Sequence, residues 1–188
     1  MKKPHIFLIS VISLFLAACA GAGILENKVN VYYISSIEAA DSQKIGCGEY
    51  LVPIETEVAD FSDTVSGVER AVAALLASDL PRPPGENSEF FTSSAFKDKY
   101  FSLESVTLQK TGGTETILVS LFHNKEVGLT GVCDTPRIQA QLTETIRTAA
   151  DNMPFEIYLD GEAKGWKCFD SQSPECEEYF RNLRSKMK

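Results

Sequence analysis

The sequence predicts an α/β chain of the α+β type, in which a mixed sheet of about five strands is packed by two helices and followed by an extra C-terminal helix. Short segments with an apolar residue at every second position alternate with longer segments whose apolar residues recur every three or four positions. The first spacing is typical of a half-buried strand, and the second of an amphipathic helix. Prolines and glycines separate these segments, as they do in turns.

The N-terminus has the features of a signal peptide. Lys2 and Lys3 precede an apolar run that extends from Ile6 to Ala18. At about 13 residues this run is well short of the roughly 20 that a membrane-spanning helix requires. We therefore expect residues 1–18 to be removed.

Leu16-Ala17-Ala18-Cys19 resembles the lipobox of bacterial lipoproteins. The resemblance implies that the thiol of Cys19 receives a diacylglycerol and that residues 19–27 form an acylated tether. Two or more acyl chains make membrane attachment stable where a single chain is marginal. We expect a lipid anchor in the cell membrane or outer membrane, with the body in the periplasm or extracytoplasmic space. The alternative is an ordinary secretory signal with a chance cysteine.

The charge of the chain argues against nucleic-acid binding. Loss of Lys2 and Lys3 reduces the 18 basic residues to 16 beside 26 acidic ones, which gives a net charge of −10. Such an acidic body lacks the basic surface that phosphate recognition requires.

Four cysteines remain once Cys19 carries lipid, and an even number in an exported chain indicates two disulfides. Three pairings are possible. Sequence proximity favours Cys168–Cys176, which leaves Cys47–Cys133. A zinc site is the competing interpretation, but no CxxC spacing occurs and the mature chain keeps only one histidine, His123.

The first half of the body predicts two strands and a helix. Residues 28–35 and 50–58 have the alternation of strands. Ser62 or Asp63 can cap a helix that runs to about Ala77. Beyond it, a Pro- and Gly-rich stretch predicts a polar loop that reaches about Lys99.

The second half predicts a hairpin, a helix and a last strand. Residues 101–110 and 114–122 flank Gly112-Gly113, a pair that suits a tight hairpin turn. The phase of the first strand indicates either a bulge near Glu104 or a strand that starts after it. Residues 117–122 are apolar on both faces, which favours a central strand of this sheet over pairing with a strand of a partner. A helix is expected from Asp134 or Thr135 to about Ala150, followed by a strand at residues 155–159.

Residues 28–162 together resemble the GerMN domain, a family named for sporulation and spore-germination proteins. The motifs that carry the resemblance are Val29-Asn30-Val31-Tyr32-Tyr33, Leu51-Val52-Pro53-Ile54, Ala71-Val72-Ala73-Ala74-Leu75-Leu76 and Phe155-Glu156-Ile157-Tyr158-Leu159-Asp160-Gly161. The chain lacks the family's "iP-x-G-T" step after the first helix. The resemblance implies a single α/β domain, commonly lipid-anchored or single-pass in the envelope, with no catalytic residues.

Residues with catalytic potential are few. His123 is the only mature histidine, and without a GxSxG motif we interpret it as a solvated loop residue rather than a catalytic base. Four carboxylates could act as acid and base or bind calcium, although alternating charges usually mark the wet face of a strand. They are Glu55, Glu57, Asp60 and Asp63. No GxGxxG or P-loop is present, so we expect no cofactor and no metal.

Residues 163–188 extend beyond the GerMN-like domain. Ser173-Pro174 can begin a helix whose apolar stripe is Tyr179, Phe180 and Leu183. It can dock on its own sheet, bind a partner or touch anionic headgroups. The sequence as a whole predicts a membrane-anchored, non-catalytic interaction or scaffolding module with an envelope protein as partner. A cell-wall-acting enzyme and a small-ligand-binding lipoprotein are the alternatives.

The anchor can be tested with Cys19→Ser, which removes the acyl acceptor. We expect this variant to appear in the soluble envelope fraction or to keep its signal peptide, whereas Ala22→Ser in the tether stays membrane-bound. Cell fractionation with mass measurement of the N-terminus is the readout. Membrane attachment of a cleaved Cys19→Ser protein would contradict the lipoprotein interpretation.

Overall fold

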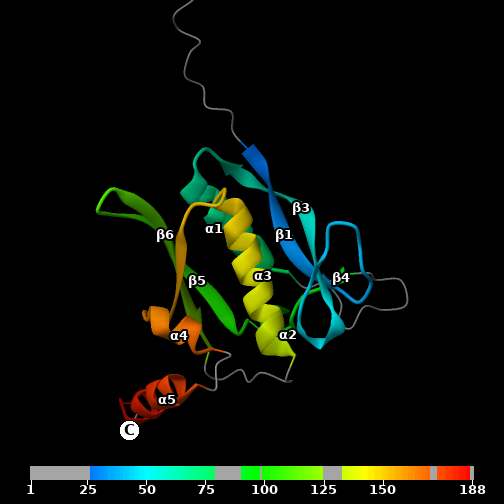
Figure 1. Cartoon of the computed structure of the whole chain (residues 1–188). Coiled ribbons are helices and arrows are strands. Elements are labelled where there is room, and N and C mark those ends of the chain that lie inside the picture. The colour runs from blue at the N-terminus through cyan, green and yellow to red at the C-terminus, as the bar shows by residue number, and fades with distance from the viewer. Residues whose placement is uncertain (1–25, 79–89, 98, 125–132, 170–172, 187–188) are drawn as a thin grey trace, which may run out of the picture.

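The computed structural model describes residues 26–78, 90–97, 99–124, 133–169 and 173–186, which form an α+β fold (Figure 1). The predicted signal peptide, Cys19 and residues 20–25 of the tether lie outside the described residues, as does the Pro-rich stretch after the first helix. In chain order the elements are β1 (Glu26–Ser35), β2 (Gln43–Lys44), the 3-10 turn η2 (Gly46–Gly48), β3 (Tyr50–Phe61), α1 (Thr64–Leu76), β4 (Phe90–Phe91), α2 (Ser94–Lys97), β5 (Phe101–Thr111), β6 (Thr114–His123), α3 (Asp134–Ala149), β7 (Phe155–Leu159), α4 (Ala163–Lys167) and α5 (Pro174–Lys186).

The strands form two sheets rather than the single mixed sheet expected from the sequence. One has the order β2-β3-β1-β4, and the other β5-β6-β7. The strand pairs of the first sheet are antiparallel. In the second sheet β6 and β7 are parallel neighbours, and the crossover helix α3 connects them along the chain. In Figure 1, α1 and α3 lie between the two sheets, and α1 contacts β1, β3 and β5. The helices therefore occupy the space that a continuous sheet would need.

Helix α1 begins and packs as its sequence predicts. Asp63 caps it by accepting a hydrogen bond from the Ser66 backbone N–H at 2.8 Å. Val68, Val72 and Leu75 are fully buried in the core. A Cβ at Gly67 would lie 2.9 Å from the ring of Phe61, so glycine allows the end of β3 to pack closely on the helix. The cap and the apolar stripe together fix the helix at the centre of the fold.

The hairpin also follows its sequence pattern. Gly112 and Gly113 have φ angles of 60° and 90°, which the tight turn requires. The register shifts between Leu103 and Ser105, which confirms the bulge near Glu104. β6 pairs with β5 on one side and β7 on the other, so the prediction of a central strand is confirmed.

The polar loop expected as far as Lys99 is wrong for residues 90–97. This segment forms β4 and α2, and Phe91 and Phe96 are buried. A strand of two residues and a helix of four are too short to show a period in the sequence. Only the Phe90-Phe91 pair signalled that the segment enters the core.

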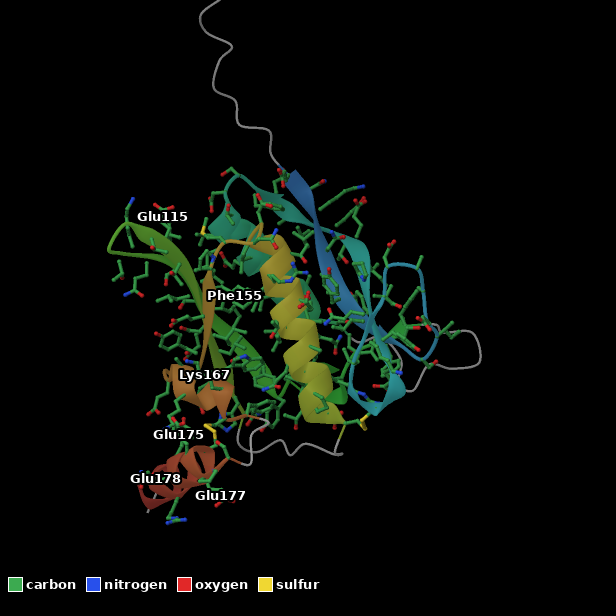
Figure 2. The ribbon with its side chains drawn as sticks, in the orientation of Figure 1. Glu115, Phe155, Lys167, Glu175, Glu177 and Glu178 are labelled. Atoms are coloured by element: carbon green, nitrogen blue, oxygen red, sulfur yellow. A yellow bond between two sulfur atoms is a disulfide. The ribbon has the colours of Figure 1, made fainter. Side chains whose placement is uncertain are left out.

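The C-terminal helix α5 lies against α4 rather than on a sheet (Figure 1). Cys168 and Cys176 form a disulfide with their α-carbons 5.1 Å apart, and Lys164 Nζ lies 3.0 Å from Glu175 Oε1. Figure 2 shows Glu175, Glu177 and Glu178 on α5, below the α4 residue Lys167 in this view. The start of β1 lies at the opposite end of the molecule from α5.

The structure contains both predicted disulfides, and they enclose very different lengths of chain. Cys47 and Cys133 are 86 residues apart in sequence, with α-carbons 6.1 Å apart, whereas Cys168 and Cys176 are separated by 8 residues. By the chain-entropy relation the long link stabilises by about 4.5 kcal/mol and the short one by about 2.5 kcal/mol.

Replacing both cysteines of the long link with serine should therefore destabilise the protein more than the same change in the short link. Urea unfolding of the two double variants gives the comparison, and non-reducing peptide mapping of wild-type protein checks the pairing. A crossed pairing, or a larger loss from Cys168→Ser with Cys176→Ser, would disprove this assignment.

Candidate functional site

The backbone N–H and C=O groups on the two edges of β1 have different kinds of hydrogen-bond partner. Tyr32 lies opposite Pro53 in the β1–β3 register, and its backbone groups point away from β3 toward α3. The Tyr32 N–H donates to Thr145 Oγ1 at 3.1 Å, and the Tyr32 carbonyl accepts from Gln141 Nε2 at 2.9 Å. Because backbone direction alternates along an antiparallel strand, Lys28, Asn30 and Ile34 also point to this second edge.

Side chains of α3 take the place of a neighbouring strand at Tyr32. Gln141 and Thr145 are fully buried, and such polar groups require hydrogen-bond partners. Gln141 also accepts from the Ser93 N–H at 3.1 Å, so one amide joins β1 to the segment between β4 and α2. Farther along the same edge, Ile34 pairs with Phe91 of β4.

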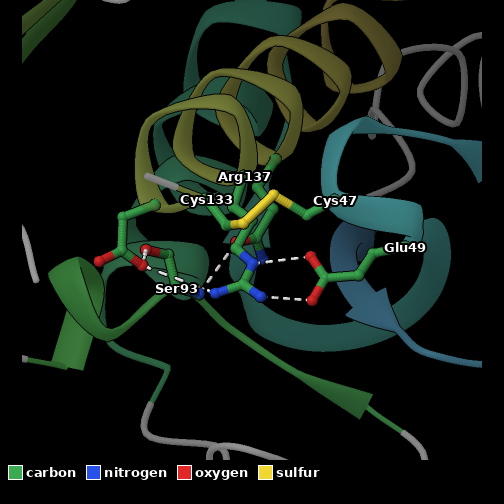
Figure 3. Close-up of polar contacts among 7 residues, drawn as sticks. Cys47, Glu49, Ser93, Cys133 and Arg137 are labelled. Atoms are coloured by element: carbon green, nitrogen blue, oxygen red, sulfur yellow. Dashed lines mark hydrogen bonds and ion pairs between the residues drawn. A yellow bond between two sulfur atoms is a disulfide. The ribbon is translucent and has the colours of Figure 1, made fainter. Parts of the chain in front are cut away.

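The start of α3 is held by a polar cluster that the sequence did not reveal (Figure 3). Arg137 donates from Nε to Glu49 Oε2 at 2.7 Å and makes a second bond from Nη2 to Glu49 Oε1. The guanidinium also lies over the Phe91 ring, 5.4 Å from its centroid. With the Cys47–Cys133 disulfide beside it, this ion pair ties the first turn of α3 to the loop before β3. Residues so distant in sequence leave no local pattern.

Beyond Tyr32 the second edge of β1 opens into a groove, which we call the edge groove. Its volume is about 390 Å³, and it lies between β1, the start of α1 and the end of α3. Its lining residues are Glu26, Lys28, Val29, Asn30, Phe61, Ser62, Asp63, Thr64, Gly67, Thr148, Ala149 and Asp151. Within the described ranges, no residue forms a hydrogen bond with the outward backbone groups of Lys28 or Asn30. The groove therefore exposes unpaired strand edge.

The edge groove is acidic. Glu26, Asp63 and Asp151 line it, while Lys28 is held by Glu55, with Nζ 2.6 Å from Oε1. That hydrogen bond raises the pKa of Lys28, and the Ser66 backbone N–H lowers the pKa of the Asp63 carboxyl. Both groups are thus charged at neutral pH, and the carboxylates outnumber the single lysine among the lining residues.

His123 is not the solvated loop residue expected from the sequence. Its side chain is 19% exposed, and its Nδ1 is in contact with Asp160 Oδ2. Asp160 also accepts from the His123 backbone N–H at 3.1 Å, because the turn after β7 brings the carboxylate beside the end of β6. The nearest rings are those of Tyr100 at 5.8 Å and Phe122 at 6.4 Å.

This arrangement holds His123 between an acid and aromatic rings. Burial raises the pKa of Tyr100, and the nearby Asp160 adds to the effect. A hydrolase of the Ser-His-Asp type would need a nucleophile on the other ring nitrogen. The rings of Tyr100 and Phe122 instead pack beside the imidazole.

The four predicted carboxylates do not converge. Glu55, Glu57 and Asp60 are exposed along β3, and Asp63 caps α1. No group of three His, Cys, Asp or Glu side chains suited to a metal ion occurs in the part of the chain that the structure describes. A second, more open cleft of about 470 Å³ between η2, α3 and α4 includes none of these carboxylates, nor His123.

Comparisons with known proteins do not identify the chain. No family model matches it, and neither a curated protein nor a solved structure is significantly similar. Among the described helices, none has the length and apolar character needed to cross a membrane.

The role of Gln141 can be tested with Gln141→Leu, which leaves the Tyr32 carbonyl and the Ser93 N–H without partners. Each such group costs about 1–3 kcal/mol, so we expect a loss of about 2–5 kcal/mol in the free energy of unfolding. Gln139→Leu, two positions earlier on α3 and half-buried, is the control. Equal losses in the two variants, measured by urea unfolding, would show that Gln141 does not satisfy the strand edge.

Proposed function

We propose that the protein is a lipid-anchored envelope lipoprotein of the GerMN type that binds another protein and has no catalytic activity. The signal peptide with its lipobox-like Cys19 supports the anchor, and the order of motifs in residues 28–162 supports the family. The two disulfides are consistent with an oxidising compartment.

The observation that carries the binding role is the uncovered edge of β1. An unpaired strand edge is a template on which an extended segment of another chain can form main-chain hydrogen bonds. Here the edge lies in a groove with two helical walls, so access is limited to a segment of suitable shape.

A small-ligand carrier and a cell-wall enzyme fit the geometry less well. Small-molecule pockets are mostly apolar and enclose their ligand, whereas charged and polar side chains dominate the lining of the edge groove. An enzyme would need convergent titratable groups beside a reactive partner. Packing rings lie beside His123, and Glu55 and Glu57 are exposed along one strand.

The anchor would place the edge groove near the membrane. Residues 20–25 span at most about 20 Å when fully extended, and β1 begins directly after them at Glu26. Helix α5 lies at the other end of the body from the start of β1. The proposal thus assigns membrane attachment to the acyl chains and not to α5.

The proposed function can be tested by photo-crosslinking in cells. A photoreactive residue at Asn30 should capture a specific envelope protein, whereas one at the exposed Gln109 of β5 should not. Capture at Asn30 should persist in His123→Ala, because the proposed role is binding without catalysis and His123 does not line the edge groove. Loss of capture in a His123→Ala protein with unchanged melting, or equal capture at both positions, would contradict the proposal.

A further inference from the structure

We propose that the edge groove receives an extended segment of a partner protein that carries lysine or arginine, and that this segment pairs with β1 at Lys28 and Asn30 as an additional strand. This inference rests on the proposed function, since it names the chemistry of the partner that the interaction module would bind.

The backbone of β1 sets the position of the added strand. Lys28 and Asn30 each present one N–H and one C=O to the groove, since their direction is the same as that of Tyr32. On the same edge, β4 already pairs antiparallel with β1 at Ile34, and α3 occupies Tyr32. Only the stretch before Tyr32 is available, so the segment has to be short.

The walls of the groove favour extended backbone with small apolar side chains facing inward. Val29, Gly67 and Ala149 contribute small apolar surfaces to the lining. Successive side chains of a strand alternate between its two faces. A segment in which small apolar residues alternate with charged ones would therefore place the charges at the rim.

The charges at the rim select a cationic segment. The carboxylates of Glu26, Asp63 and Asp151 line the groove, and Glu55 neutralises Lys28. Arg147 at the end of α3 is itself paired with Glu144 at 2.6 Å and donates to Asn152 at 3.0 Å. A second copy of this chain, with a net charge of −8 over the full sequence and −10 without Lys2 and Lys3, is the less complementary occupant.

The test uses the mature acylated protein, which begins at Cys19, in detergent micelles with three fluorescent peptides. The first is Lys-Val-Lys-Ala-Lys-Val-Lys, the second replaces every lysine with glutamate, and the third keeps the lysines but carries N-methyl groups on alternate amides. In low-salt anisotropy titrations we expect the lysine peptide to bind at least about ten-fold more tightly than either control, because opposite charge and main-chain bonds are both required.

Asn30→Pro tests the backbone contact on the protein side. The outward N–H of Asn30 is not part of the β1–β3 ladder, so proline removes the donor while leaving that ladder intact, in the way that Pro53 is accommodated in β3. We expect about ten-fold weaker binding of the lysine peptide. Asn30→Ala, which changes only the side chain, should bind within about two-fold of wild type.

Glu26→Gln combined with Asp151→Asn tests the charge contact. Asp151 has a φ of 49°, a conformation that asparagine tolerates well, so the exchange preserves the turn after α3. We expect roughly three- to ten-fold weaker binding at low salt and a weaker dependence on salt concentration.

Three results would overturn the inference: equal binding of the lysine and glutamate peptides, equal binding of the N-methylated peptide, or Asn30→Pro that binds as tightly as Asn30→Ala. If Asn30→Pro does not fold, the N-methylated peptide on wild-type protein decides the question. Failure of the lysine peptide together with successful crosslinking at Asn30 would refute the cationic strand but leave the proposed function standing. If the lysine peptide does not bind and Asn30 captures no partner, both this inference and the proposed function are refuted.

Discussion

The second edge of β1 is the constraint on which the rest of the structure depends. Backbone groups buried at this edge require partners, and the fold supplies them from a helix instead of a strand. Gln141 and Thr145 of α3 bind the carbonyl and the N–H of Tyr32, at 2.9 and 3.1 Å. Because α3 stands where a further strand would lie, only the two-residue β4 extends the sheet on this edge, and β5, β6 and β7 form a sheet of their own.

The position of α3 along β1 decides where the edge is covered. Its first turn is fixed by the Cys47–Cys133 disulfide and by the bidentate pair of Arg137 with Glu49. From that end the helix reaches Tyr32, whose hydroxyl accepts from Thr148 Oγ1 at 3.2 Å, and stops at Ala149. Lys28 and Asn30 lie beyond its reach, so the restraints that stabilise one end of α3 also leave the edge groove at the other.

Local patterns predicted the longer helices and strands, but neither the short β4 and α2 nor how the elements meet. The N-cap at Asp63, the Gly112-Gly113 turn and the apolar stripes of α1 and α3 each involve neighbours within a few positions, and the sequence located them. The partition into two sheets depends on contacts between Tyr32 and α3 residues more than 100 positions away. The pairs His123–Asp160 and Glu49–Arg137 are likewise set by tertiary structure, and no period or motif marks them. The lipid anchor and the GerMN resemblance remain predictions.

Residue-resolved amide hydrogen exchange on the free protein tests the central claim most directly. If α3 covers β1 only as far as Tyr32, the amides of Val29 and Val31, which face β3, and of Tyr32, which donates to Thr145, should exchange slowly. The amides of Lys28 and Asn30 should exchange at rates close to those of unprotected backbone. Protection of Asn30 equal to that of Val31 would mean that the edge is already paired in the free protein, and would contradict the existence of an open groove.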